Sequence, residues 1–139
     1  MSRLIRNLGS LTLLAVFLVF ATATTEESTE QDVRSSAPAF SISAAELFAD
    51  YEANELAADQ RYKDKVFTVT GTVEDIGEDI TGTPYLTLKA SPLFSVQCMF
   101  SNSYRSQLAR VSKGSSVSLT CKGKGKMGNV LLGGCVFAR

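Results

Sequence analysis

The stretch Lys65-Val66-Phe67-Thr68-Val69-Thr70-Gly71-Thr72-Val73 decides the fold that we predict for this chain. Phe67, Val69 and Val73 alternate with threonines, and this period of two is typical of a half-buried β-strand. Gly71 stands where the apolar face would carry its third side chain, and a glycine inside a strand usually marks a bend. We therefore predict that the segment is the first strand of a small, curled sheet.

The first 23 residues have the three-part pattern of a secretory signal peptide. Arg3 and Arg6 precede an apolar run from Leu11 to Phe20, and Ala21-Thr22-Ala23 follows as a small-residue cleavage site. We predict export to a periplasmic or extracellular location with cleavage after Ala23. The alternative is an uncleaved membrane anchor, although the apolar run is short beside the roughly 20 residues that span a bilayer. With no cysteine near the site, we expect no lipid anchor.

Residues 24–40 are rich in Ser, Thr and Glu, and we predict a disordered spacer there because such a segment buries little apolar surface. A single folded domain over 41–139 follows. The net charge of zero hides an asymmetry, since ten acids and three bases fall in 24–64 and four acids and nine bases in 65–139. We interpret this as an acidic helix beside a basic sheet edge.

A helix is predicted directly before the first strand. Ser43-Ala44-Ala45-Glu46 forms a capping box, in which the Ser and Glu side chains satisfy backbone N–H groups. Apolar residues then recur at roughly helical spacing as far as Tyr62. Asn54 is a good N-cap, so two short helices that meet there are an equal alternative to one helix. We expect the apolar stripe to pack across one mouth of the barrel.

The remaining elements complete a mainly β fold with some helix. Alternating segments predict strands over 84–89, 94–100, 116–121 and 130–137, and Tyr104, Leu108 and Val111 indicate a short helix over 103–111. Glu74–Gly82 is expected to be a solvated, charged hairpin loop, and Lys122–Asn129 a flexible basic turn. A helix, three strands, a short helix and two strands match the OB-fold, a five-stranded barrel.

The residues also resemble a known family. Asn54-Glu-Leu-Ala-Ala-Asp-Gln-Arg-Tyr-Lys, Val69-Thr-Gly71 and the closing Cys121-Lys-Gly…Cys135 are similar to the tRNA_anti-like group of bacterial OB-fold lipoproteins. The likeness covers Ile42 to Phe137. It implies an exported OB domain without an established activity, while the missing lipobox cysteine departs from the lipoprotein members.

Three cysteines leave one unpaired if an exported chain forms a disulfide. A turn centred on Gly128 places Cys121 opposite Cys135, and we predict that this pair is bonded and that Cys98 is a free, buried thiol. A turn centred between Met127 and Gly128 would shift the register by one residue and reverse the facing side chains. Cys98 with Cys135 is the competing pair, because the barrel brings their strands together.

We predict that the chain is not an enzyme and uses no cofactor or metal. It contains no His, so Ser–His and Cys–His nucleophile pairs are not available. No two cysteines have C-x-x-C spacing, and the glycines after Lys122 do not form a phosphate-binding loop. Neither catalytic, nor metal, nor cofactor-binding residues are therefore proposed.

The leading hypothesis is a binding module of the cell envelope whose ligand is a protein, peptide or glycan. OB-folds bind ligands on the outer face of their second and third strands. There, alternation turns Tyr85, Gln97 and Met99 outward, and the basic turn would border them with Lys122, Lys124 and Lys126. The alternative is a single-stranded nucleic-acid-binding domain. Such sites combine a positive channel with several aromatic side chains. We do not favour this alternative, because Tyr85 is the one clear exposed aromatic candidate on this face and the chain contains no Trp.

Overall fold

The computed structural model describes residues 25–139, so the predicted signal peptide lies outside the described residues. Four α-helices, one 3₁₀-helix and six strands follow one another in this part of the chain. They are α1 (Thr25–Ser35), β1 (Ser41–Ser43), α2 (Ala44–Ala53), α3 (Glu55–Tyr62), β2 (Val66–Glu78), β3 (Pro84–Lys89), β4 (Ser95–Met99), η1 (Asn102–Tyr104), α4 (Arg105–Leu108), β5 (Ser116–Met127) and β6 (Asn129–Phe137). Within 25–139, no helix has the length and apolarity needed to cross a membrane.

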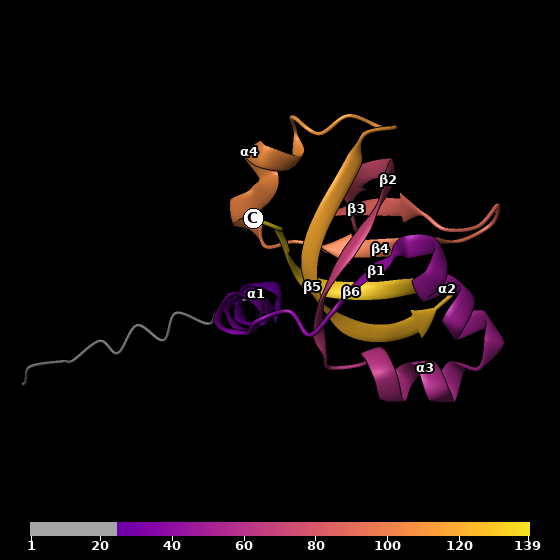
Figure 1. Cartoon of the computed structure of the whole chain (residues 1–139). Helices are drawn as coiled ribbons and strands as arrows, with labels where there is room; N and C mark the ends of the chain where they lie inside the picture. Colours follow the sequence, from indigo (N-terminus) through magenta and orange to yellow (C-terminus); the bar gives the residue numbers. More distant parts are fainter. Residues whose placement is uncertain (1–24) are drawn as a thin grey trace, which may run out of the picture.

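The strands β2 to β6 form a closed barrel (Figure 1). Neighbouring strands run in the order β2-β3-β4-β6-β5, and β5 pairs with β2 to close the circle. The pair β4–β6 is parallel and the other barrel pairs are antiparallel. This confirms the predicted five-stranded OB-fold barrel, with helices before it and a short helix between its third and fourth strands.

The long strand β2 belongs to both halves of the barrel. Residues 66–72 pair with β5, and residues 73–78 pair with β3. The register shifts between Val73 and Asp75, so the irregularity lies just beyond Gly71. Because the strand continues to Glu78, the prediction of a hairpin loop over Glu74–Gly82 is wrong in its bounds.

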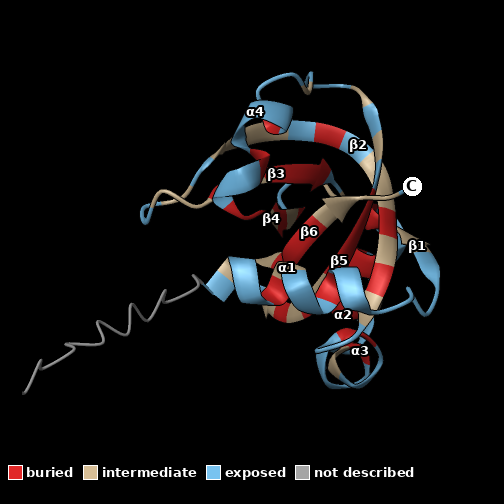
Figure 2. Ribbon diagram, turned by 90° about the vertical axis from the view of Figure 1, so that its left-hand side faces the viewer, coloured by how far each residue is buried: buried red, intermediate tan, exposed pale blue. Residues whose placement is uncertain are grey.

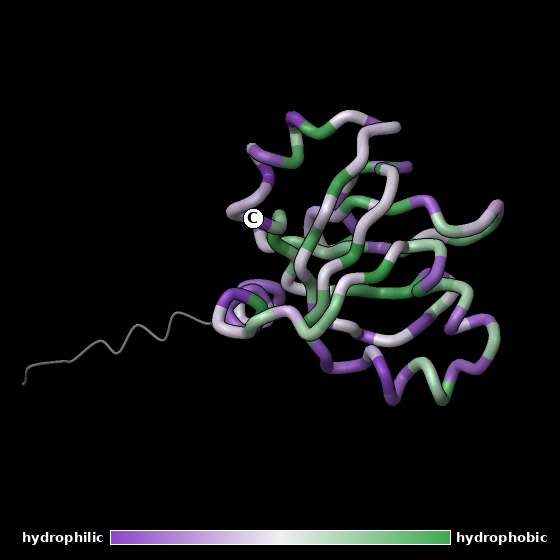
Figure 3. The backbone as a smooth tube through the Cα atoms, in the orientation of Figure 1, coloured by the Kyte–Doolittle hydropathy of each residue, from purple (hydrophilic) through white to green (hydrophobic). Residues whose placement is uncertain are grey.

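The barrel interior holds the core, and α2 and α3 close one end of it (Figure 2). Inward side chains such as Phe67, Leu86 and Leu119 are fully buried. Apolar residues follow the strands, whereas α1 and α3 are mostly hydrophilic (Figure 3). Ser43 and Glu46 form the predicted capping box, and the Asn54 side chain caps α3, which confirms the alternative of two helices.

The helix α1 corrects the prediction of a disordered spacer over 24–40. It spans Thr25–Ser35 and packs against β6, with Thr29 and Val33 buried. Composition predicted disorder because Val33 is the one large apolar residue of this helix. The contacts that order it are mainly polar and come from residues about 70 to 108 positions away.

The segment predicted as a flexible basic turn is mostly strand. β5 continues to Met127, and the turn to β6 centres on Gly128, whose φ is 72°. Gly123 serves another purpose, because a Cβ atom there would lie 2.0 Å from the carbonyl oxygen of Tyr62. The glycine thus lets the end of α3 approach the strand. In a sequence, a glycine required for such a close approach looks the same as a glycine required by a turn.

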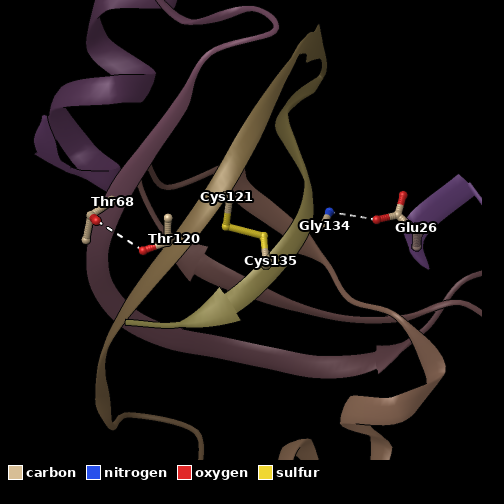
Figure 4. The surroundings of a disulfide bond; sticks show 6 residues. All are labelled: Glu26, Thr68, Thr120, Cys121, Gly134 and Cys135. Atoms are coloured by element: carbon tan, nitrogen blue, oxygen red, sulfur yellow. Dashed lines mark hydrogen bonds between the residues drawn. A yellow bond between two sulfur atoms is a disulfide. The ribbon is translucent and has the colours of Figure 1, made fainter. Parts of the chain in front are cut away.

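The disulfide joins Cys121 of β5 to Cys135 of β6 (Figure 4). Cys98 is a free, buried thiol. Met127 pairs with Asn129 and Thr120 with Val136, as a turn centred on Gly128 requires. Two register shifts lie between these pairs and cancel each other. The predicted pairing is therefore the one that the structure contains.

Candidate ligand face and adjoining groove

The outer face of β3 and β4 carries the side chains that alternation predicted. Leu86, Leu88, Val96 and Cys98 point into the barrel with no exposed area. The residues between them turn outward, and the register sets Tyr85 beside Met99 and Thr87 beside Gln97. Thr87 is buried, so we give the name ligand face to the three half-buried outward residues, Tyr85, Gln97 and Met99.

A chain of side-chain hydrogen bonds crosses the ligand face. The Ser95 hydroxyl donates to the carboxylate of Glu74 on β2, and the Ser95 N–H donates to Asn129 Oδ1 over 2.9 Å. Asn129 Nδ2 donates to Gln97 Oε1 at 3.4 Å, and Gln97 Nε2 contacts Met99 Sδ at 3.3 Å. The polar groups of β2, β4 and β6 are thus held in place before any ligand arrives.

Tyr85 supplies the aromatic surface of the ligand face. Its hydroxyl lies over Gly77 of β2, where an added Cβ atom would be 3.2 Å away. The side chain is half-buried, so one part of the ring packs against the sheet and another part remains accessible. A ring held in this way can stack on an apolar or planar part of a ligand.

A groove of about 520 Å³ adjoins the ligand face at Met99. It lies between the first turn of α1, the loop 79–83 and the end of β4, and its volume suits a small ligand or one part of a larger one. Its lining combines apolar surface with four side-chain hydroxyls and one side-chain amide. The lining residues are Thr25, Glu26, Asp79, Thr81, Gly82, Thr83, Met99, Phe100, Ser101 and Asn102.

Asp79 and Glu26 are the charged residues of this groove. Asp79 Oδ1 accepts hydrogen bonds from the Thr81 hydroxyl at 2.7 Å and from the N–H groups of Thr81 and Thr83 at 2.9 Å. These bonds, that of the Thr81 hydroxyl first, lower the pKa of Asp79. Glu26 Oε2 accepts the N–H of Gly134 at 2.9 Å. The charged side chains that line the groove are therefore both acidic, and Arg105 stands at its edge, where it donates to the Gly82 carbonyl.

The three lysines predicted to border the ligand face, Lys122, Lys124 and Lys126, do not form one border of it. Lys122 pairs with Asp32 of α1 at 3.2 Å. Lys126 pairs with Glu52 of α2 at 3.1 Å and lies over the ring of Phe48. The side chains of Lys122 and Lys126 are thus turned toward different helices, although both residues belong to β5.

Lys124 is the lysine that comes nearest to the groove. A Cβ atom on Gly133 would lie 2.9 Å from Lys124 Cε and 3.4 Å from the Glu26 carboxylate. The lysine side chain and the Glu26 carboxylate therefore lie side by side over β6. Together the ligand face and groove have no continuous positive channel among the described residues.

The described residues contain one group with metal-ligand chemistry, the sulfur atoms of Cys98, Cys121 and Cys135, which lie within 4.8 Å of one another. Two of these sulfurs are bonded to each other. Burial raises the pKa of the Cys98 thiol, and burial also raises the pKa of Tyr62 to about 12. These two groups belong to the core, away from the ligand face and groove.

The structure places Tyr85, Gln97 and Met99 outward, as alternation predicts. It adds Glu74, Asn129 and the groove, which the predicted site does not include, because the sequence predicts a solvated loop at Glu74 and a flexible turn at Asn129. Both reach the ligand face through the strand order, which places β2 and β6 on either side of β3 and β4. The signal that points to these two residues in the sequence is their position: Glu74 follows the predicted first strand, and Asn129 follows the turn glycine Gly128.

Comparison with known proteins agrees with the fold. The tRNA_anti-like family model matches residues 4–136. A "putative nucleic acid-binding lipoprotein" from Klebsiella pneumoniae shares 18% identity and a TM-score of 0.60, over 78% of this chain and 97% of that one. A "putative aspartyl-tRNA synthetase" from Leishmania major shares 13% identity and a TM-score of 0.47, over 67% of this chain and 19% of that one. No curated protein matches.

Proposed function

The chain belongs to the tRNA_anti-like family, and from this premise we propose that it is an exported, non-catalytic binding module of the bacterial cell envelope. Its ligand is a protein, peptide or glycan that lies across the ligand face and extends into the groove. The fold alone does not carry this function. The arrangement of the side chains on the ligand face supports it.

The observation that carries the proposal is the chain of hydrogen bonds from Glu74 through Ser95 and Asn129 to Gln97. Polar side chains on an ordinary surface turn freely in water, and ordering them costs conformational entropy. Here that cost is met on folding, before a ligand binds, which favours recognition. Tyr85 beside this network supplies apolar contact area.

Export is supported by the N-terminal pattern and by the disulfide. Disulfides persist in secreted and periplasmic proteins and are rare in the cytosol. Cys121 and Cys135 are buried in the barrel, where the bond adds to the stability of the folded domain.

The non-catalytic character is supported by the groups that the groove offers. Among the residues described, the lining of the groove contains two carboxylates, and hydrogen bonds lower the pKa of one of them, Asp79. General acid–base catalysis near neutral pH needs a group whose pKa lies near 7. The lowered pKa of Asp79 moves that carboxyl away from this range.

A second candidate is single-stranded nucleic-acid binding, which the description of the Klebsiella protein favours for that protein. Phosphate contacts require cationic side chains along the path of the strand. In this chain Lys122 and Lys126 are engaged with Asp32 and Glu52. Glu26 and Asp79 line the groove with the opposite sign of charge. We therefore favour a ligand without phosphates.

Two measurements on the mature chain test this choice. The first is titration with fluorescent dT30 and rU30 at low and at high salt, where we expect no binding. An affinity that rises steeply as salt falls would contradict the proposal and support the nucleic-acid candidate.

The second measurement is affinity capture from envelope extract with the wild type and with a Tyr85→Ala/Gln97→Ala variant. We expect a specific protein or glycan that the wild type retains and the variant loses. The matched control is Gln60→Ala, an exposed substitution on α3. Equal retention by all three chains would contradict a ligand site at Tyr85 and Gln97.

A further inference from the structure

The helix α1 lies on the outside of the barrel, beside β5 and β6 (Figures 1 and 2). Only Thr29 and Val33 of its eleven residues are buried. A helix of this length has little stability of its own, so contacts with the barrel must order it. Because few apolar groups of α1 are buried, polar contacts contribute much of the stability of its packing against the barrel.

Three carboxylates of α1 meet three donors on the barrel. Glu26 accepts the N–H of Gly134 at 2.9 Å, Glu30 accepts the Ser101 hydroxyl, and Asp32 pairs with Lys122 at 3.2 Å. The donors come from β6, from the segment after β4 and from β5. They converge on one helix only in the folded barrel.

Glu30 and Arg34 extend this contact toward η1. Arg34 Nε donates to Glu30 Oε1 at 2.6 Å, and the arginine also donates to the hydroxyl of Tyr104. The guanidinium lies over the Tyr104 ring, 5.7 Å from its centroid. Both oxygens of Glu30 are thus engaged, one by the helix and one by Ser101.

The barrel surface under α1 is shaped for a helix backbone. A Cβ atom on Gly134 would lie 2.4 Å from the carbonyl carbon of Thr29 and 2.6 Å from the nitrogen of Glu30. Gly134 has a φ of 58°, a conformation in which its N–H reaches Glu26. Side chains at this position would keep the helix away from the sheet.

We propose that this surface, formed by Ser101, Lys122, Gly133 and Gly134 and here named the helix-docking wall, is a receptor site for acidic helices. The helix α1 is its tethered occupant. An acidic helical segment of a partner protein, with carboxylates at positions i and i+4 like Glu26 and Glu30, takes the place of α1. Because Thr25 and Glu26 also line the groove, this exchange alters the groove beside the ligand face.

The test uses the full mature chain, in which substitutions in α1 weaken the contact between α1 and the barrel and leave the helix-docking wall unchanged. Val33→Asp and Glu30→Lys together place a charge in the buried contact and reverse the charge that meets Ser101. Hydrogen exchange should show that the amides of α1 lose protection in this variant while those of the barrel keep it. Persistent protection of α1 would overturn the claim that the helix is exchangeable.

The probe is an acetylated and amidated peptide of residues 25–35, added to the ¹⁵N-labelled chain. In the variant, we expect saturable NMR shifts of the Ser101, Gly133 and Gly134 amides at millimolar peptide. In the wild type the same shifts should be at least tenfold smaller, because α1 occupies the wall. A folded variant with exposed α1 that shows no such shifts would overturn the proposal.

A matched control peptide separates acidic recognition from general helix binding. It carries Glu26→Gln, Glu30→Gln and Asp32→Asn, and we expect it to bind the variant at least tenfold more weakly. Raising NaCl from 50 to 500 mM should weaken the acidic peptide several-fold, because one of its contacts is an exposed ion pair. Equal binding of the two peptides would overturn the requirement for carboxylates.

Discussion

Reducing the disulfide between Cys121 and Cys135 should lower the melting temperature of the domain by about 12 °C. The bond closes a loop with a sequence separation of 14, and the chain-entropy model assigns about 3 kcal/mol to a loop of this size. Unfolding entropy near 2.1 cal/mol/K per residue gives about 0.24 kcal/mol/K for the described part of the chain. The ratio of these two values is the expected shift.

The assay is calorimetry of the same chain with and without a phosphine reductant. Thiol counting after denaturation should find one thiol in the oxidised protein and three in the reduced one, as expected if Cys98 is free. Using one chain in two redox states avoids the cavities that cysteine substitutions leave in the core.

A Cys98→Ala variant is the matched control. It keeps the disulfide, so its oxidised and reduced forms should differ by the same amount as those of the wild type. Melting temperatures of the oxidised and reduced wild type within about 3 °C of each other would refute the stabilising role. Loss of the redox difference in Cys98→Ala would refute the pairing and support Cys98 with Cys135.

Three further predictions follow from the packing around β5 and α3. Replacing Lys122, Lys124 and Lys126 by Ser should lower the free energy of unfolding by about 1 kcal/mol, because two ion pairs with well-exposed carboxylates are lost. Urea titration measures this loss, and an unchanged stability would show that these ion pairs do not stabilise the contacts of α1 and α2 with β5. Gly123→Ala should lower the free energy of unfolding by at least about 2 kcal/mol, because the alanine Cβ would overlap the Tyr62 carbonyl. A loss below about 0.5 kcal/mol in the same urea titration would contradict this close approach. The pKa of Tyr62 is raised to about 12, chiefly by burial, so the stability that its protonated hydroxyl contributes is complete below pH 10 and is lost as pH rises through 12. Tyr62→Phe should reduce the fall in stability between pH 10 and 12, to which Tyr51, whose pKa is also raised, still contributes; an unchanged slope would contradict a contribution from Tyr62.

Local patterns predicted much of the fold. Alternation in β2 to β4, the capping box at Ser43 and the Asn54 cap are properties of short stretches, and the structure contains them. The register around Gly128 was sufficient to select Cys121 and Cys135, because two shifts in the hairpin cancel.

Contacts between distant residues account for what the sequence did not predict. The order of α1 depends on Ser101, Tyr104 and Gly134, which no local pattern links to an acidic segment. The sequence predicts a turn at Gly123, because a glycine required by a neighbouring backbone has the same signature in sequence as a turn glycine. Alternation placed Gln97 outward, but only the strand order brings Asn129 to it.

Ligand binding at the ligand face is tested most directly with a photo-crosslinking benzophenone side chain at Met99, at the junction of the ligand face and groove, in cells that express the full chain. The control carries the same side chain at Gln60, which is exposed on α3. We expect illumination to yield a discrete adduct with an envelope protein, peptide or glycan from position 99 and none from position 60. Equal adducts from both positions, or a nuclease-sensitive adduct at position 99, would contradict it.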